Sequence, residues 1–158
     1  MVSIRPARPA ECETVADLHE RSIRALGPAA YDAEQVDAWA ANKDPDRYAI
    51  EEPGSHFVVA VEGESILGFG ELVPDEREVR AVYVDPERAG EGVGRRLLAH
   101  LEATARERGL ERLHLRSSKN AAGFYERCGW RAGETVVHET TGGVELGCVR
   151  MTKRLDGG

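Results

Sequence analysis

Three closely spaced glycines give this chain its clearest chemical signal. Gly90, Gly92 and Gly94 follow an apolar segment and precede a segment whose apolar residues recur at helical spacing. A strand that passes through glycines into a helix presents unpaired main-chain N–H groups and the positive end of the helix dipole. Because small residues let an anion approach these groups closely, the pattern predicts a phosphate-binding cradle. Its residues are Ala89, Gly90, Glu91, Gly92, Val93, Gly94 and Arg95.

Two other phosphate-binding motifs fit this loop poorly. A P-loop requires Gly-Lys-Ser/Thr after its glycines, whereas this loop continues Gly94-Arg95-Arg96. A dinucleotide-binding fingerprint requires Gly-x-Gly-x-x-Gly, and Arg95 stands at its third glycine position. The alternative without any binding role is a glycine-rich turn that caps an ordinary helix.

The residues around the glycines carry a family resemblance. The segment YVDPERAGEGVGRRLL resembles the acetyl-CoA-binding motif of the GNAT N-acetyltransferases, in which Arg/Gln-x-x-Gly-x-Gly/Ala follows a strand that ends near a proline. Ala89 occupies the Arg/Gln position and Arg88 stands one residue earlier. A second segment, NAAGFYERCGW, resembles the family pattern N-x-x-A-x-x-F-Y-x-x-x-G-F from Asn120 to Trp130. The resemblance is good from about residue 66 to residue 130 and loose elsewhere.

This resemblance implies how acetyl-CoA would be held as a co-substrate. Val82 and Val84 would pair their main chains with the pantetheine amides, like an added strand. A bulge near Val82 or Tyr83 would free an N–H group for the thioester carbonyl oxygen. Asn120 would contribute a side-chain contact to the cofactor.

Acetyl transfer to an amine also needs a proton donor for the thiolate and a proton acceptor for the amine. Tyr125, in the NAAGFYERCGW segment, is the candidate proton donor for the thiolate. An alkylammonium of pKa about 10.4 is almost fully charged at neutral pH, so a base or a water chain must take its proton. Glu78 is the first candidate base because some family members carry a glutamate there, with Glu71 and His138 as further candidates.

The resemblance therefore predicts an N-acetyltransferase that acts on a primary amine of a small molecule or a protein. No Gly-x-Ser-x-Gly elbow is present, so we expect direct attack in a ternary complex without an acyl-enzyme. An acyl-CoA-binding sensor or partner-binding module without turnover is an alternative from another class. Transfer of a longer acyl group is a third reading.

Composition restricts the class of partner. The net charge is -7, which argues against nucleic acid as a ligand and favours cationic amines at long range. The same acid excess also arises in proteins from a salt-rich or GC-rich source. No apolar run approaches the length of about 18 residues that a membrane span needs, and the N-terminus lacks a leader pattern. We expect a cytoplasmic protein without a membrane partner.

The cysteines and histidines are isolated along the chain. Three cysteines, Cys12, Cys128 and Cys148, form no Cys-x-x-Cys pair, and no histidine stands near them at zinc-ligand spacing. The sequence therefore predicts free thiols and no metal site.

Apolar spacing and turn residues predict one α/β domain over residues 1–158. We expect a mostly antiparallel mixed sheet flanked by helices, and the family resemblance implies that strands four and five run parallel and splay apart. Asp32 and Gln35 fit a capping box at the start of the second helix. Ser117 to Asn120 are expected to cap the last helix, and Thr141 to Gly143 to turn the final hairpin. The sheet edges leave room for a homodimer. The expected elements span residues 3–6, 10–26, 56–62, 65–72, 78–84, 92–108, 113–116, 131–138 and 144–154. Two further helices are expected to begin at residues 32 and 121.

Overall fold

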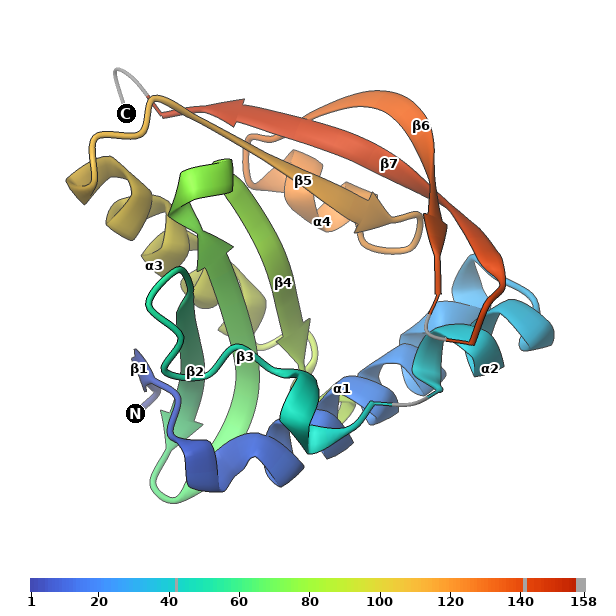
Figure 1. The fold of residues 1–158 in the computed structure, drawn as a ribbon, viewed down its shortest axis with the longest axis horizontal. Coiled ribbons are helices and arrows are strands. Elements are labelled where there is room, and N and C mark those ends of the chain that lie inside the picture. Colours follow the sequence, from blue (N-terminus) through green and yellow to red (C-terminus); the bar gives the residue numbers. More distant parts are fainter. Residues whose placement is uncertain (42, 141, 156–158) are drawn as a thin grey trace.

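A seven-stranded sheet with the strand order β1-β2-β3-β4-β5-β7-β6 runs through the molecule (Figure 1). The computed structural model describes residues 1–41, 43–140 and 142–155, so Thr141 of the expected hairpin turn lies outside the described residues. The strands are β1 (Ser3–Pro6), β2 (His56–Glu62), β3 (Ser65–Val73), β4 (Glu78–Val84), β5 (Arg112–Ser118), β6 (Arg131–Glu139) and β7 (Glu145–Arg154). The α-helices are α1 (Cys12–Leu26), α2 (Ala33–Ala40), α3 (Val93–Glu107) and α4 (Ala122–Arg127).

The sheet is antiparallel except between β4 and β5. These two strands are parallel, and their register contains the single pair Glu78 and His114. Beyond this pair they diverge, which opens the sheet into a V whose arms carry β1–β4 and β5–β7–β6 (Figure 1). The expected mixed sheet with parallel, splayed fourth and fifth strands is confirmed.

Side-chain alternation along the strands divides the core between the two faces of the sheet. In β2, Val58 and Ala60 pack with apolar residues of α3, whereas Phe57 and Val59 pack with apolar residues of α1. The α4 residue Tyr125 belongs to the first of these clusters. Because α3 and α1 cover opposite faces of the same strands, each face of this arm of the sheet packs against its own helix.

Local capping signals place most helix ends where we expect them. Asp32 accepts a hydrogen bond from the Gln35 main chain, and the Gln35 side chain accepts one in return, so the capping box of α2 is confirmed. Gly109 follows α3 with φ of +79°, a conformation that glycine adopts without strain.

The expected serine caps of α4 are wrong. Ser117 and Ser118 belong to β5, which extends to Ser118, and the Ser117 hydroxyl donates a 2.7 Å hydrogen bond to the Ser118 carbonyl. The helix α4 begins after Ala121 without a side-chain cap. Pairing with β7 continues up to Ser118 and Cys148, so strand pairing wins over the local capping tendency of serine.

A buried carboxylate joins α3 to the arm of the sheet that contains β7. Glu102 is buried and accepts hydrogen bonds from Trp130 Nε1 at 3.1 Å and from Lys153 Nζ at 2.7 Å. We expect Glu102→Gln to lower the free energy of unfolding by about 1 to 2 kcal/mol, because the amide keeps an acceptor but leaves the Lys153 charge unpaired. Urea denaturation measures this change. Glu107→Gln on the exposed side of α3 is the control, and an equal loss in both variants would contradict the explanation.

Candidate active site

The glycine run forms a row of unpaired N–H groups at the start of α3. None of the main-chain N–H groups from Gly90 to Arg95 donates to an acceptor within the described part of the chain; the first helical bond is from Arg96 to the Gly92 carbonyl. Gly90 and Gly92 have φ of +82° and +86°, which L-residues with a side chain rarely adopt. The chain can therefore turn its amides outward here because these positions are glycines.

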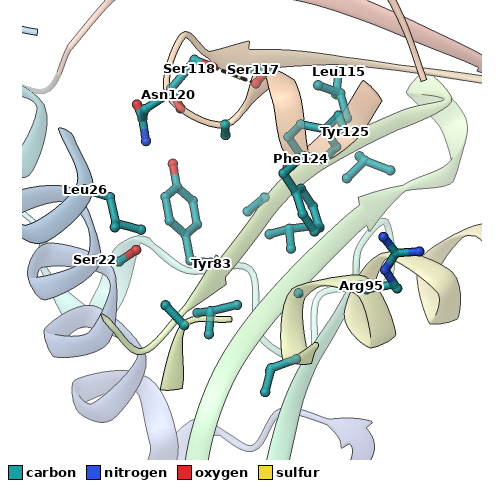
Figure 2. Close-up of a pocket in the computed structure, with 18 of the residues that line it drawn as sticks. Ser22, Leu26, Tyr83, Arg95, Leu115, Ser117, Ser118, Asn120, Phe124 and Tyr125 are labelled. Carbon is teal, nitrogen blue, oxygen red and sulfur yellow. Dashed lines mark hydrogen bonds between the residues drawn. The ribbon is translucent and has the colours of Figure 1, made fainter. Parts of the chain in front are cut away.

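A pocket of about 570 Å³ lies in front of this row, bounded by β4, the start of α3, the end of β5 and α4 (Figure 2). Glu91 is the one predicted cofactor residue that does not line it; this side chain is exposed and its carboxylate accepts from Arg88 Nε at 2.9 Å. The fold thus brings together two segments far apart in sequence. The predicted residues that line the pocket are Val82, Tyr83, Val84, Ala89, Gly90, Gly92, Val93, Gly94, Arg95, Asn120 and Tyr125.

Two polar groups on the α4 side of this pocket have no partner among the described residues. The Tyr125 hydroxyl forms no hydrogen bond with a described residue, while its ring packs edge-on against Phe124 and Trp130. Burial, followed by the proximity of Tyr83 and Cys128, raises the pKa of Tyr125, so its phenol stays protonated. Asn120 Oδ1 is buried and without a partner among the described residues. A buried acceptor of this kind requires a donor from a ligand or water.

The edge of β4 that faces β5 is open beyond the Glu78–His114 pair. Val79 to Val84 pair with no described residue on that side, so their main chain is available for a ligand that lies between the strands. The register against β3 passes from Glu71–Ala81 to Leu72–Val79, which makes Arg80 the additional residue of a β-bulge. The bulge therefore lies at Arg80 and not at Val82 or Tyr83, where the family resemblance implied it.

The bulge determines which side chains share a face. Glu78 and Tyr83 are separated by an odd number of positions, so a regular strand would place them on opposite faces. With Arg80 inserted, both line a second pocket of about 590 Å³ on the α1 side of the sheet. The three candidate bases, Glu78, Glu71 and His138, all line this second pocket, whereas Tyr125 lines the first.

The two pockets meet at the opening between β4 and β5. Seven residues line both of them: Trp39, Val79, Arg80, Ala81, Tyr83, Arg116 and Ser118. Figure 2 shows the Tyr83 side chain at this boundary, with its hydroxyl directed toward the side of the pocket where Asn120 lies. A ligand in the first pocket can therefore be met by a second ligand that enters from the other face.

The aromatic residues of the N-terminal helices divide between the pocket and the core. Trp39 lines both pockets. Tyr31 is buried, donates to the Gly147 carbonyl at 2.8 Å and accepts from the Lys119 N–H, also at 2.8 Å. It therefore ties α2 to the β5–β7 arm and does not line either pocket.

The carboxylates of the second pocket sit in different environments. Glu78 is buried, and its Oε1 accepts from Arg80 Nε at 3.0 Å and Nη2 at 2.9 Å. Glu71 is also buried, and its Oε2 accepts from the Ser55 hydroxyl at 2.8 Å. Burial is the main cause that raises the pKa of Glu71; the Ser55 bond and Arg80 oppose it, and Glu78 adds to it.

His19 on α1 is an unusually buried imidazole in this pocket. Burial, with further contributions from Lys43 and Arg47, lowers its pKa to about 3. The folded chain therefore binds fewer protons than the unfolded chain below about pH 6.5, so acid favours unfolding. We expect the free energy of unfolding to fall by about 1 kcal/mol from His19 alone between about pH 7 and pH 5.5.

Denaturant titrations across this pH range, compared with those of His19→Gln, measure that contribution. The variant should lose part of the acid dependence because glutamine does not titrate. An unchanged pH slope in His19→Gln would show that other groups carry the acid sensitivity.

Several residues of the second pocket have no motif in the sequence. His19, Lys43, Arg47 and Arg116 come from α1, the segment after α2 and β5. Single polar residues on separate elements carry no spacing signal. For Arg116 alone, side-chain alternation along the strand could have given a signal. Arg116 lies between buried Leu115 and Ser117, so its side chain faces away from the core of its arm.

The described residues contain no group of three or more His, Cys, Asp or Glu side chains placed to hold a metal ion. In the same part of the chain, no helix combines the length and the apolar character that a membrane crossing requires.

The fold and the split sheet define an N-acetyltransferase architecture. The structure superposes with a TM-score of 0.88 on a GCN5-related N-acetyltransferase from Rhodopseudomonas palustris, at 30% identity over 96% of this chain and 94% of the other. The PaiA N-acetyltransferase from Thermoplasma acidophilum, solved in complex with coenzyme A, has the same fold, with a TM-score of 0.74, 20% identity, and coverage of 98% and 99%.

Sequence comparison agrees with the fold. A family model described as an acetyltransferase (GNAT) domain matches residues 28–155, and this chain belongs to the GNAT acetyltransferase family. The N-alpha-acetyltransferase RimI of Mycobacterium tuberculosis is 38% identical over 76 residues, which is 44% of this chain. The match spans 48%, or about half, of the length of that relative.

Proposed function

We propose that this protein transfers an acetyl group from acetyl-CoA to a primary amine by direct attack in a ternary complex. The observation that carries the proposal is the pair of pockets that meet at the β4–β5 opening, one lined by the amide cradle and Tyr125 and the other by carboxylates. Donor and acceptor can then approach from opposite faces, which supplies the proximity that a two-substrate reaction requires.

The first pocket fits the chemistry of CoA. Diphosphate oxygens are acceptors that match the unpaired N–H groups from Gly90 to Arg95, and the positive end of α3 favours their charge. Pantetheine amides carry donors and acceptors that match the open main chain of Val82 and Val84 and the unpartnered Asn120 Oδ1. Bound there, acetyl-CoA supplies the acyl thioester.

Tyr125 supplies the proton for the leaving thiolate. The amine nitrogen attacks the carbonyl carbon, the carbon–sulfur bond breaks, and the phenol proton passes to sulfur while the amine proton passes to a base. A phenol of pKa about 10 gives a proton to a thiolate of conjugate pKa about 8.5 only in close contact. Burial opposes both anions, the phenolate and the thiolate, so the apolar setting of Tyr125 raises the pKa of donor and acceptor together.

Glu78 is the base that we propose for the amine. It lines the acceptor-side pocket and shares the Arg80 guanidinium with Glu76. Glu78→Gln should lower kcat/KM about tenfold to 100-fold at neutral pH, with less effect at higher pH where the free amine is abundant. Initial rates from about pH 7 to pH 9.5 measure this. Glu71→Gln and His138→Gln are the matched variants. If Glu71 or His138 is the base instead, the loss of kcat/KM should appear in the variant of that residue and not in Glu78→Gln.

A steady-state assay of thiol release across a panel of amines tests the proposed activity. We expect acetyl-CoA-dependent thiol release that rises with amine concentration, and calorimetry should show CoA binding without amine. Tight CoA binding with no amine that accelerates thiol release would favour the alternative of a non-catalytic acyl-CoA sensor. Longer acyl-CoA donors in the same assay test whether acetyl is the preferred group.

A further inference from the structure

Cations gather in the second pocket of this acidic protein. Lys43 and Arg47, from the segment between α2 and β2, and Arg116 of β5 all line it. Although the chain carries a net charge of -7, neither Arg47 nor Arg116 forms an ion pair with a described residue. Arg80 in the same pocket differs, because Glu76 and Glu78 neutralise it.

These cations lie close to one another. After burial, the charges of Arg116, Lys43 and Arg47 each lower the pKa of His138, and all four residues line the second pocket. Burial and Arg47 also lower the pKa of Lys43 to about 8. The carboxylate end of the pocket is separate in its contacts: Glu71 and Glu78 interact with Ser55 and Arg80. The lining also includes the exposed Glu139 beside His138, so the pocket carries three cations and one carboxylate near His138 and two carboxylates, Glu71 and Glu78, near Arg80.

His19 has a buried ring nitrogen without a partner among the described residues in the same pocket. Its Nδ1 lies 3.0 Å from the Tyr48 hydroxyl, and its Nε2 is buried without a partner among the described residues. Burial raises the pKa of Tyr48 to about 12, so the phenol keeps its proton and is able to donate it to Nδ1. In the tautomer that accepts this bond, the neutral imidazole carries its proton on Nε2, which has no acceptor among the described residues. His19 is 8% exposed, and a buried donor of this kind requires a ligand or water oxygen.

We propose that the acceptor is a small primary amine that carries a carboxylate, such as a free amino acid. Its carboxylate lies among Lys43, Arg47, Arg116 and the His19 Nε2–H, and its amine faces the β4–β5 opening beside Glu78. Guanidinium groups and N–H donors hold a carboxylate through short charge-assisted hydrogen bonds. This inference rests on the proposed acetyl transfer and names its substrate class.

Matched pairs of amines test the carboxylate directly. Each free amino acid is compared with its carboxamide and with the amine that lacks the carboxyl group, using thiol release with saturating acetyl-CoA. We expect kcat/KM to be at least about tenfold higher for the free acids. A peptide with a free N-terminal amine and an amidated C-terminus is the arm that represents a protein acceptor, and it should react as poorly as the carboxamides.

Charge-neutral variants show whether the pocket cations cause the preference. Arg47→Gln and Arg116→Gln should each lower the ratio of kcat/KM for the free acid to kcat/KM for its carboxamide about fivefold to tenfold. Arg112→Gln is the matched control, because Arg112 lies on the same strand as Arg116 but outside both pockets. The control should keep the full preference for the acid.

Different failures separate this inference from the proposed function. Carboxamides, simple amines or the peptide reacting as fast as free acids would overturn the inference and leave acetyl transfer standing. A preference for acids that survives in both Arg47→Gln and Arg116→Gln would overturn the assigned site. No amine-dependent thiol release at all would overturn the proposed function, and the inference with it.

Discussion

Replacing Tyr125 by phenylalanine is expected to lower kcat about 100- to 1,000-fold while the KM for acetyl-CoA changes little. The variant keeps the aromatic packing against Phe124 and Trp130 and removes only the hydroxyl, which bonds to none of the described residues. Without it the thiolate must leave with no positioned acid, and general acid catalysis is typically worth factors of this size. Steady-state rates with acetyl-CoA and a good amine measure the loss.

Tyr83→Phe is the matched control for this result. Tyr83 is the second phenol at the boundary of the two pockets, stacked on Phe69 and close to His19. If Tyr125 is the acid, Tyr83→Phe keeps most of the activity. A large loss of kcat in Tyr83→Phe together with a nearly active Tyr125→Phe would transfer the acid role to Tyr83. Equal thermal midpoints in both variants show that packing is intact.

Gly92→Asp is expected to raise the dissociation constant of CoA about 100-fold. Gly92 is the N-cap of α3 and stands in the centre of the unpaired N–H groups. A carboxylate there repels the CoA diphosphate and competes for the same donors; two like charges about 5 Å apart at an effective dielectric constant of about 20 cost about 3 kcal/mol. Isothermal titration calorimetry with CoA at low ionic strength measures the change.

Gly92→Asn separates charge from backbone strain. Asparagine has almost the same shape as aspartate and also tolerates positive φ, so both variants pay the same conformational cost at φ of +86°. We expect the dissociation constant of CoA to be at least about tenfold lower for Gly92→Asn than for Gly92→Asp. This difference should shrink as salt is added. Equal affinities in the two variants would show that the diphosphate does not lie at this helix start.

Local signals in the sequence were sufficient for elements whose ends are set by near neighbours. The capping box of Asp32 and Gln35 and the glycine after α3 needed only residues within one turn of the helix. The amide row from Gly90 to Arg95 also follows from a strand, glycines and a helix start in succession. By contrast, Ser117 and Ser118 looked like helix caps because their pairing with β7, more than twenty-five residues later, is invisible in a local window.

The sequence by itself determined the row of unpaired N–H groups at the start of α3, the FYERCGW segment that carries Tyr125, and the order of strands and helices, because each depends on contiguous residues. Only the tertiary structure decided which side chains share a pocket. The bulge at Arg80 brings Glu78 to the face of Tyr83, and the divergence of β4 from β5 joins the two pockets. The cations of the second pocket come from separate elements. Their meeting results from long-range packing, which has no periodicity along the chain.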